Sequence, residues 1–534
     1  MFRVPAALAA AASSLLKLKV SAPWSIEARL ARDLGSVYST GSVSLKRNRL
    51  CIAGCVLRGV PAILAGATLL AEVYEVGPGK TYEAIGQAPW AALQPGDTVL
   101  IHWRPEPYRE KWVICRRGSE DAPITVRGVP GPDGQLPVVS GDQALTPQPL
   151  NFWNEARGVI KIGGANVPAD IMPGYIVLEN LEIGSARPGY KFTGRDGVPQ
   201  PYAMNAAAIY VEKAEHLTIR NCVLRDCGNG LFIGSGNAAV TRDVLVEGNY
   251  ILDNGNLDSM YEHNSYTEAL DIVFQFNRYG RLREGARGNN LKDRSAGLVV
   301  RYNWIEGGNR QLDLVDAGAA PILSSPRYRA AQVYGNILIE PPDEGNRQIV
   351  HYGGDSGLPE NFRKGTLFFH HNTIVSTRTD RTTLFRLSTN EEHCEARNNI
   401  FHVPAGGRTL SLVDSSGVLR LSRNWTKPGW VATFGTLEGA IEDDGTGIAG
   451  ESPGFLGEGE QDFRLAAGSP CVDAAGALPE AVVPDHAVTG QYVKHQRGEA
   501  RPDDGRPDIG AFEVARPLGR VETGTHGLKA VPLF

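Results

Sequence analysis

Three short polar segments carry the residue types that could do chemistry. They are Tyr261–Glu268, Gly288–Arg294 and Gly308–Asp316. Within them Glu268, Lys292 and Asp316 follow one another at equal intervals of 24 residues. If each interval is one turn of a coiled chain, these three side chains stack on one face. Because side chains alternate along a strand, Lys292 and Arg294 are expected to project from the same side.

The sequence around these segments is basic. Between Arg278 and Arg310 there are eight basic residues and three acidic ones, whereas the whole chain of 534 residues has a formal net charge of −5. A local excess of positive charge on an acidic protein indicates an anionic ligand bound at one place. The overall charge excludes a globally basic nucleic-acid binder, and we expect no nucleic-acid partner.

The chemistry that fits such a cluster is β-elimination at a uronate, a sugar that carries a carboxylate. The proton beside that carboxylate is weakly acidic, so cations must neutralise the carboxylate while a base removes the proton. An Arg fork or a calcium ion can do the first, and a Lys among other cations can do the second. The predicted catalytic residues are Lys292, Arg294, Arg310, His263 and Tyr266, and the predicted substrate-binding residues are Asn290, Arg347, His351 and Asp313.

Two other functions are open from the same residues. A glycoside hydrolase would use Asp313 and Asp316, together with Glu268, as its acid and base. A non-catalytic carbohydrate-binding surface protein would use the cations without cleaving the ligand. The whole cluster could also be structural, with Asp293 simply pairing with Arg294 or Arg310 on a solvated face.

A repeat that ends in Asn predicts the scaffold. The intervals between successive Asn residues are 41, 28, 28, 26, 33, 36, 27 and 25, and each unit holds short alternating strands without a stretch long enough for a crossover helix. Parallel strands need a crossover, which a chain winding fully round supplies. This predicts an all-β fold, a single-stranded right-handed parallel β-helix with coils stacked at about 4.8 Å. The repeated residues are Asn180, Asn221, Asn249, Asn277, Asn303, Asn336, Asn372, Asn399 and Asn424.

The Asn residues are expected to occupy left-handed bends and to hydrogen-bond from coil to coil. A short helix around residues 83–93 is expected to cap the first coil, since an open strand edge needs cover. The segments Asp462–Leu465 and Asp508–Glu513 are expected to close the last coils.

The first seventy residues have the layout of an export signal. Basic residues at 46–49 precede an apolar stretch that ends near small residues at 65–67. We predict an N-terminal extension at 1–45, a signal-like segment at 46–71, the β-helix domain at 72–514 and a flexible tail at 515–534. The protein is then a secreted or periplasmic monomer without stable membrane association, and a retained membrane anchor at 50–71 is the alternative.

Three motifs resemble a known superfamily. Pro95–Val99, Ala122–Gly128 and Asp508–Glu513 look like the corresponding segments of secreted bacterial right-handed β-helix proteins of the pectin-lyase-like superfamily. The resemblance covers residues 74–514. Many members are polysaccharide lyases or hydrolases, so the resemblance implies this fold and a polysaccharide substrate.

The polar segments partly resemble chondroitinase-B-like and alginate lyases. That resemblance implies a Lys base, here Lys292, and a calcium ion held by Asn264 and Glu268 as the cofactor. At position 313, where the family carries its Arg, this chain has Asp. The resemblance therefore implies that Arg310 or Arg294 takes the role of that Arg.

Overall fold

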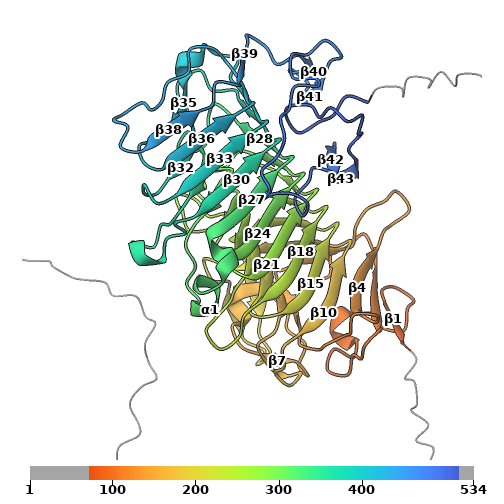
Figure 1. The fold of residues 1–534 in the computed structure, drawn as a ribbon. Helices are drawn as coiled ribbons and strands as arrows, with labels where there is room; N and C mark the ends of the chain where they lie inside the picture. Colours follow the sequence, from red (N-terminus) through yellow and green to blue (C-terminus); the bar gives the residue numbers. More distant parts are fainter. Residues whose placement is uncertain (1–70, 516–534) are drawn as a thin grey trace, which may run out of the picture. The chain divides into compact units, whose positions relative to one another are not determined.

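The computed structural model describes residues 71–515, which wind into a right-handed parallel β-helix (Figure 1). The predicted fold is therefore confirmed. The predicted extension, signal-like segment and tail lie outside the described residues, apart from residues 71 and 515. Within residues 71–515, no helix is both long and apolar enough to cross a membrane.

Successive coils of the described chain contribute strands to three long parallel sheets. The thirteen-stranded sheet consists of β1 (Val73–Val76), β2 (Thr98–His102), β4 (Ile124–Val129), β10 (Gly174–Glu179), β15 (Glu215–Arg220), β18 (Arg242–Glu247), β21 (Leu270–Gln275), β24 (Ala296–Arg301), β27 (Ala330–Tyr334), β30 (Thr366–His370), β33 (His393–Arg397), β36 (Val418–Ser422) and β38 (Ala440–Asp443). The eleven-stranded sheet consists of β5 (Val138–Ser140), β11 (Glu182–Ala186), β16 (Val223–Cys227), β19 (Tyr250–Leu252), β22 (Arg278–Tyr279), β25 (Trp304–Glu306), β28 (Ile337–Glu340), β31 (Thr373–Ser376), β34 (Ile400–His402), β37 (Trp425–Thr426) and β39 (Ile448–Ala449). The ten-stranded sheet consists of β3 (Trp112–Ile114), β8 (Gly158–Ile162), β14 (Ala207–Val211), β17 (Asn229–Ile233), β20 (Ser265–Thr267), β23 (Leu291–Asp293), β26 (Leu312–Leu314), β29 (Gln348–Tyr352), β32 (Thr382–Leu387) and β35 (Leu410–Val413).

The remaining elements are short. The small strands are β6 (Ala144–Leu145), β7 (Asn151–Phe152), β9 (Ala165–Val167), β12 (Lys191–Thr193), β13 (Pro199–Pro201), β40 (Phe455–Gly457), β41 (Asp462–Leu465), β42 (Gly490–Val493) and β43 (Arg497–Ala500). The helical turns are α1 (Ala320–Leu323) and the 3₁₀ turns η1 (Ile85–Gln87), η2 (Glu155–Arg157), η3 (Pro326–Arg329), η4 (Pro359–Asn361) and η5 (Gly407–Thr409).

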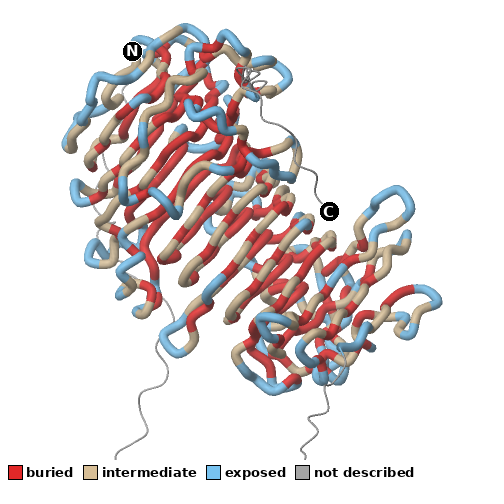
Figure 2. The backbone as a smooth tube through the Cα atoms, turned by 45° about the vertical axis from the view of Figure 1, so that its right-hand side comes forward, coloured by how far each residue is buried: buried red, intermediate tan, exposed pale blue. Residues whose placement is uncertain are grey.

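The strands bury alternate side chains inside the coil. In β24, for example, Ala296, Leu298 and Val300 are buried while the residues between them are partly exposed. Because this alternation repeats in every coil, the buried side chains form one continuous core along the stack. Exposed residues are concentrated in the connecting loops (Figure 2). The stacked strands thereby form rigid, parallel outer faces on which side chains of successive coils align.

Seven of the nine predicted Asn residues form a buried ladder. Each amide Nδ2 donates to the Oδ1 of the next Asn at 2.9–3.1 Å, from Asn249 at one end to Asn424 at the other. The left-handed bend lies one residue earlier, for example at Phe276 with φ 56°. The predicted bend position is therefore wrong for the ladder residues and right for Asn180 and Asn221, which have φ of 59° and 53°.

Both ends differ from expectation. The predicted N-terminal helix at 83–93 is a single 3₁₀ turn, Ile85–Gln87, packed over the buried Trp90. The C-terminal segments do not stack as final coils. They fold back along the outer side of the eleven-stranded sheet, where Phe463, Tyr492 and Phe512 pack with Trp304 (Figure 1).

Candidate functional site

An outward-facing row of side chains runs along the ten-stranded sheet. Strand register places one residue of each strand from β8 to β32 in this row. In order they are Lys161, Tyr210, Phe232, Tyr266, Lys292, Asp313, His351 and Arg386. The row changes from aromatic to charged between Tyr266 and Lys292. Phe232, Tyr266 and Arg386 are partly exposed and the other five residues of the row are buried. A sugar polymer could therefore stack on the exposed aromatic rings and meet charges further along the row.

Lys292 and Arg294 share one carboxylate, that of Asp355. Lys292 Nζ contacts Asp355 Oδ2, and Arg294 Nη2 donates to Asp355 Oδ1 at 2.8 Å. Arg294 Nε also donates to the Tyr266 hydroxyl oxygen at 2.9 Å. One guanidinium thus joins a carboxylate to a phenol oxygen. Burial would lower the pKa of Arg294, but Tyr266, Asp355 and Asp316 raise it above its ordinary value, so the charge is permanent.

Asp313 is the buried centre of the charged half. Its carboxylate accepts from Lys292 Nζ at 2.5 Å, Asn289 Nδ2 at 2.7 Å and His351 Nδ1 at 2.8 Å, and lies 3.5 Å from Arg310 Nη1. Burial would raise the pKa of Asp313, but Lys292, His351 and Arg310 hold it well below its ordinary value. Asp313 is therefore a fixed negative charge that gathers the surrounding cations.

A polar network inside the coil supports this cluster from below. Asp293, fully buried, accepts from Thr267 Oγ1 and Ser295 Oγ at 2.7 Å each. The guanidinium of Arg363, also fully buried, lies 3.4 Å from the Asp293 carboxylate and donates to the Val315 carbonyl at 3.0 Å. These contacts fix β23, the strand from which Lys292 projects.

The predicted stacking of Glu268, Lys292 and Asp316 is wrong. Lys292 aligns with Tyr266 on one neighbouring strand and with Asp313 on the other. The coils here have unequal lengths, so equal spacing in sequence does not give alignment. The structure does place Lys292 and Arg294 on the same side, as the alternation predicted, because both reach Asp355.

The residues assigned to calcium do not fit a common metal site. Asn264 is fully buried, and its amide donates to Asn290 Oδ1 at 2.6 Å and accepts from Asn254 Nδ2 at 2.9 Å. The carboxylate of Glu268 instead accepts from the backbone N–H groups of Gly318 and Ala319. No group of three or more His, Cys, Asp or Glu side chains suited to a metal occurs in residues 71–515.

Two predicted substrate-binding residues lie away from the cluster. Asn290 belongs to the buried Asn264 pair, and its amide donates to the carbonyl groups of Glu306 and Gly307. Arg347 is half exposed and pairs with Asp380 at 3.1 Å. His351 and Asp313 lie in the row itself.

The predicted basic groove is smaller than the sequence indicated. Of the eight basic residues between 278 and 310, three belong to the cluster: Lys292, Arg294 and Arg310. Others pair with acidic residues elsewhere, as Arg287 does with Asp258 and Arg283 with Asp226.

His263 is buried beneath Tyr266, with the two rings edge to face at 5.4 Å. Its Nδ1 accepts from the Asn289 backbone N–H at 2.8 Å. Burial first, and the charge of Lys292 second, lower the pKa of His263 to about 3. The ring is therefore neutral, and its contacts position Tyr266 and Asn289.

The neutral state of His263 predicts a pH effect on stability. Below pH 6.5 the His263 ring binds a proton in the unfolded chain but stays neutral in the folded protein. The free energy of unfolding therefore falls as the pH falls. Between pH 6.5 and pH 5 this group alone removes ~2 kcal/mol of unfolding free energy. Urea unfolding of wild type and His263→Asn at both pH values measures it, and the variant should lose ~2 kcal/mol less than wild type. Identical losses in the two proteins would contradict the buried neutral state.

Three residues of the site were missed by the sequence reasoning: Asp355, Arg386 and Ser388. Arg386 stands beside His351 in the row, and among the described residues its guanidinium has no hydrogen-bond or ion-pair partner. Ser388 follows β32 directly, and its hydroxyl lies 2.9 Å from His351 Nε2. The alternating Thr382–Leu387 segment was a detectable strand signal, but its alignment with Lys292 depends on loop lengths.

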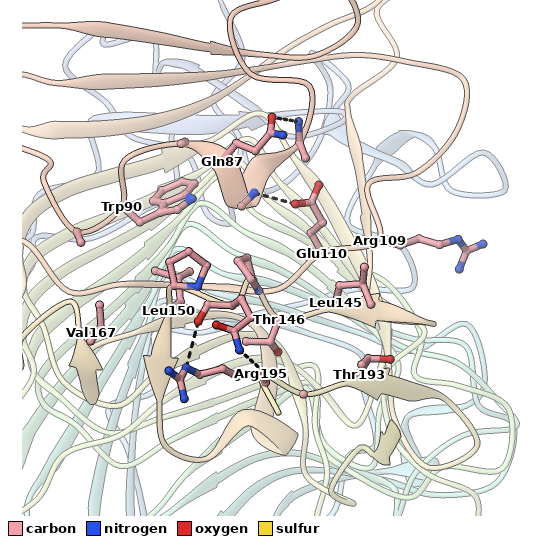
Figure 3. Close-up of a pocket in the computed structure, with 18 of the residues that line it drawn as sticks. Gln87, Trp90, Arg109, Glu110, Leu145, Thr146, Leu150, Val167, Thr193 and Arg195 are labelled. Carbon is pink, nitrogen blue, oxygen red and sulfur yellow. Dashed lines mark hydrogen bonds between the residues drawn. The ribbon is translucent and has the colours of Figure 1, made fainter. Parts of the chain in front are cut away.

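A separate hollow of about 1000 Å³ lies at the N-terminal end of the stack (Figure 3). Its lining is mainly apolar and includes Pro147, Leu150 and Leu145. The charged side chains at its edge are already engaged: Glu110 accepts from the Gly86 N–H at 2.7 Å and Arg195 donates to the Gln148 carbonyl at 3.1 Å. None of its lining residues belongs to the outward row.

Comparison with known proteins identifies likeness of fold. No protein-family profile and no curated protein matches the sequence. An alginate lyase from Paenibacillus sp. str. FPU-7 is 13% identical, with 65% of this chain and 99% of that chain covered and a TM-score of 0.43. Pectate lyase Pel9A is 13% identical, with 83% and 96% covered and a TM-score of 0.45. The GH136 lacto-N-biosidase from Eubacterium ramulus is 11% identical, with 71% and 68% covered and a TM-score of 0.40. These neighbours include both polysaccharide lyases and a glycoside hydrolase, so the activity must be argued from the site.

Proposed function

We propose that this protein is a polysaccharide lyase that cleaves an anionic, uronate-containing polymer by β-elimination. The observation that carries the proposal is the position of Asp355, whose carboxylate bridges Lys292 and Arg294 although its side chain is 35% exposed. A carboxylate held by two cations at the surface marks the place that a uronate carboxylate would take. Asp355 lies in the loop after β29, from which it can move aside.

The geometry supplies the remaining parts of an elimination. With its charge neutralised by Lys292 and Arg294, the uronate carboxylate makes the neighbouring C–H more acidic. The Tyr266 oxygen shares the Arg294 guanidinium with that carboxylate position, so we assign its phenolate form, with the hydroxyl proton given up to solvent beforehand, to receive the proton from the sugar carbon. As the proton leaves, a carbon–carbon double bond forms, the glycosidic C–O bond breaks, and the departing oxygen is protonated from Tyr266 or solvent.

This assignment changes the role first predicted for Lys292. Its ammonium group contacts two carboxylates, Asp313 and Asp355. A side-chain nitrogen held between two carboxylates is placed to bind another carboxylate, so we assign Lys292 to hold the uronate carboxylate and not to act as the base. Arg386, further along the row, and Arg310, next to Asp313, are assigned to bind the next acidic sugars.

The hydrolase alternative finds less support. Its proposed pair, Asp313 and Asp316, is buried. Asp313 is committed to Lys292 and His351, and Asp316 Oδ1 accepts from the backbone N–H groups of Asp355 and Ser356. A hydrolytic pair must reach the glycosidic bond on both sides.

We also propose export to the cell exterior or periplasm, which suits a polymer substrate.

A substrate screen tests the proposed function. The purified protein is incubated with alginate, pectate, glycosaminoglycans and bacterial exopolysaccharides, and both ultraviolet absorbance and reducing ends are followed. The lyase predicts new absorbance from the unsaturated sugar together with new chain ends on at least one uronate polymer. Reducing ends without absorbance would show a hydrolase, and binding without either signal would show a carbohydrate-binding protein.

Removing Asp355 tests whether it occupies the carboxylate position. Without this side chain a substrate no longer competes with an internal carboxylate, so Asp355→Ala is expected to lower KM by up to about tenfold with little change in kcat. Steady-state kinetics measure both constants. Asp343→Ala, which removes an exposed carboxylate paired with Arg281, serves as the control. A raised KM in Asp355→Ala would mean that Asp355 binds substrate.

A further inference from the structure

Ser388, His351 and Asp313 form a continuous hydrogen-bonded chain at the charged end of the row. Asp313 Oδ1 lies 2.8 Å from His351 Nδ1, and His351 Nε2 lies 2.9 Å from Ser388 Oγ. Three successive strands supply these groups, since β26 and β29 carry Asp313 and His351, and Ser388 directly follows β32. The elimination proposed above leaves His351 and Ser388 unused.

The hydrogen-bond network assigns the proton positions. Asp313 is an ionised acceptor, so His351 donates from Nδ1 and its Nε2 carries the lone pair. Burial lowers the pKa of His351, and this effect outweighs the opposing effect of Asp313. The ring is therefore neutral near pH 7. The Ser388 hydroxyl has two acceptors within reach, His351 Nε2 at 2.9 Å and the Gly354 carbonyl oxygen at 3.1 Å, and we assign its proton to the nearer Nε2. The Ser388 oxygen accepts from the Gly354 N–H at 2.9 Å. A hydroxyl whose proton points at an oriented neutral imidazole is an activated nucleophile.

The surroundings of Ser388 suit attack on a carbonyl. Asp313 and His351 are buried, whereas Ser388 is partly exposed. Gly353 comes so close that a Cβ there would lie 2.4 Å from Ser388 Oγ, and its φ of 138° also favours glycine. The Gly354 N–H already donates to Ser388 Oγ. The unpaired Arg386 guanidinium, which neighbours His351 in the row, is a donor that could stabilise a negative oxygen.

We propose that Ser388, His351 and Asp313 hydrolyse a carboxylic ester carried by a sugar of the polymer in the groove, such as an O-acetyl group. Ser388 Oγ bonds to the carbonyl carbon as its proton passes to His351 Nε2. The ester C–O bond then breaks, and the sugar oxygen takes that proton. Water attacks the resulting acyl-serine, gives its proton through His351 to Ser388 Oγ, and releases the carboxylic acid. Asp313 positions His351 throughout.

This second activity would act on the same bound polymer as the proposed lyase but does not need elimination to occur. An ester on a sugar hydroxyl adds bulk without charge, so its removal would let the polymer lie closer to Lys292 and Arg294. The two reactions have separate products, a carboxylic acid and an unsaturated sugar, and can be followed in one sample.

The experiment compares the wild type with Ser388→Ala, and with Ser356→Ala as a matched control. Ser356 is an exposed serine two residues beyond Gly354. Release of p-nitrophenol from p-nitrophenyl acetate and of acetate from O-acetylated alginate are measured, with ultraviolet absorbance recorded in parallel. Labelling by a fluorophosphonate, located by mass spectrometry, identifies the nucleophile, and thermal unfolding checks that each variant is folded.

The proposal expects ester hydrolysis by wild type and Ser356→Ala, labelling at Ser388, and a loss of about 10³-fold or more in Ser388→Ala. Elimination should persist in Ser388→Ala. Absence of both hydrolysis and labelling in wild type, or hydrolysis undiminished in folded Ser388→Ala, would overturn this proposal alone. Acetate release, with no unsaturated product from any uronate polymer of the substrate screen, would overturn the proposed lyase and leave the ester hydrolase standing.

Discussion

Tyr266→Phe is expected to lower kcat for polymer cleavage by about 10²–10⁴-fold, the range that a positioned proton acceptor contributes. The change removes only the phenol oxygen and leaves the aromatic ring in place. Lys292, Arg294 and Asp355 keep their mutual contacts, so substrate carboxylates should still bind and KM should change little. Initial rates of ultraviolet absorbance over a range of polymer concentrations measure both constants.

Tyr210→Phe is the matched control for this variant. Tyr210 lies in the same outward row, two strands before Tyr266, on the aromatic side. Loss of its hydroxyl should leave kcat within about twofold of wild type, since Tyr210 lies two strands away from the reacting atoms and takes no part in the proposed proton transfer. Equal losses in the two variants, or full activity in Tyr266→Phe, would remove Tyr266 from the proton-transfer role.

Arg363→Met is expected to lower the free energy of unfolding by ~3–5 kcal/mol. The guanidinium donates inside the coil to backbone carbonyls of Val315 and Ser295 at 3.0 and 2.9 Å, and it is the cation beside the buried Asp293. Without it a buried charge is left without its cation. Urea unfolding at pH 7 measures the loss, and adding Asp293→Asn should restore part of it.

The control for Arg363 is Arg327→Met. Arg327 pairs with Asp271 at the surface, where its side chain is 65% exposed, so the expected loss is at most ~1 kcal/mol. The elimination rate should fall with Arg363→Met as well, because β23 carries Lys292. Similar stability losses for the two Arg variants would contradict the supporting role of the buried pair.

The fold was predictable from the sequence because one physical requirement repeats. A buried polar side chain at a fixed point of each coil must satisfy its hydrogen bonds with its neighbour, and Asn does so with one donor group and one acceptor. Hence Asn249 to Asn424 recur at coil spacing. The exact bend position was not predictable. Each ladder Asn must point its side-chain amide along the stack, and the left-handed backbone conformation is taken by the residue before it.

The site was predictable only in part. Lys292 and Arg294 were found because alternation along one strand is local. Alignment between strands depends on the lengths of intervening loops, and the coil between Asp313 and His351 contains a long insertion with α1. That insertion and its successor place Asp355 beside Lys292, and Arg386 and Ser388 beside His351, a juxtaposition that equal spacing could not reveal.

The most direct measurement is a crystal structure with a bound uronate oligosaccharide. The account predicts a sugar carboxylate within hydrogen-bond distance of Lys292 Nζ and Arg294 Nη2, with Asp355 displaced and Tyr266 Oη facing the carbon beside that carboxylate. An oligosaccharide bound elsewhere, with Asp355 still bridging the two cations, would contradict it.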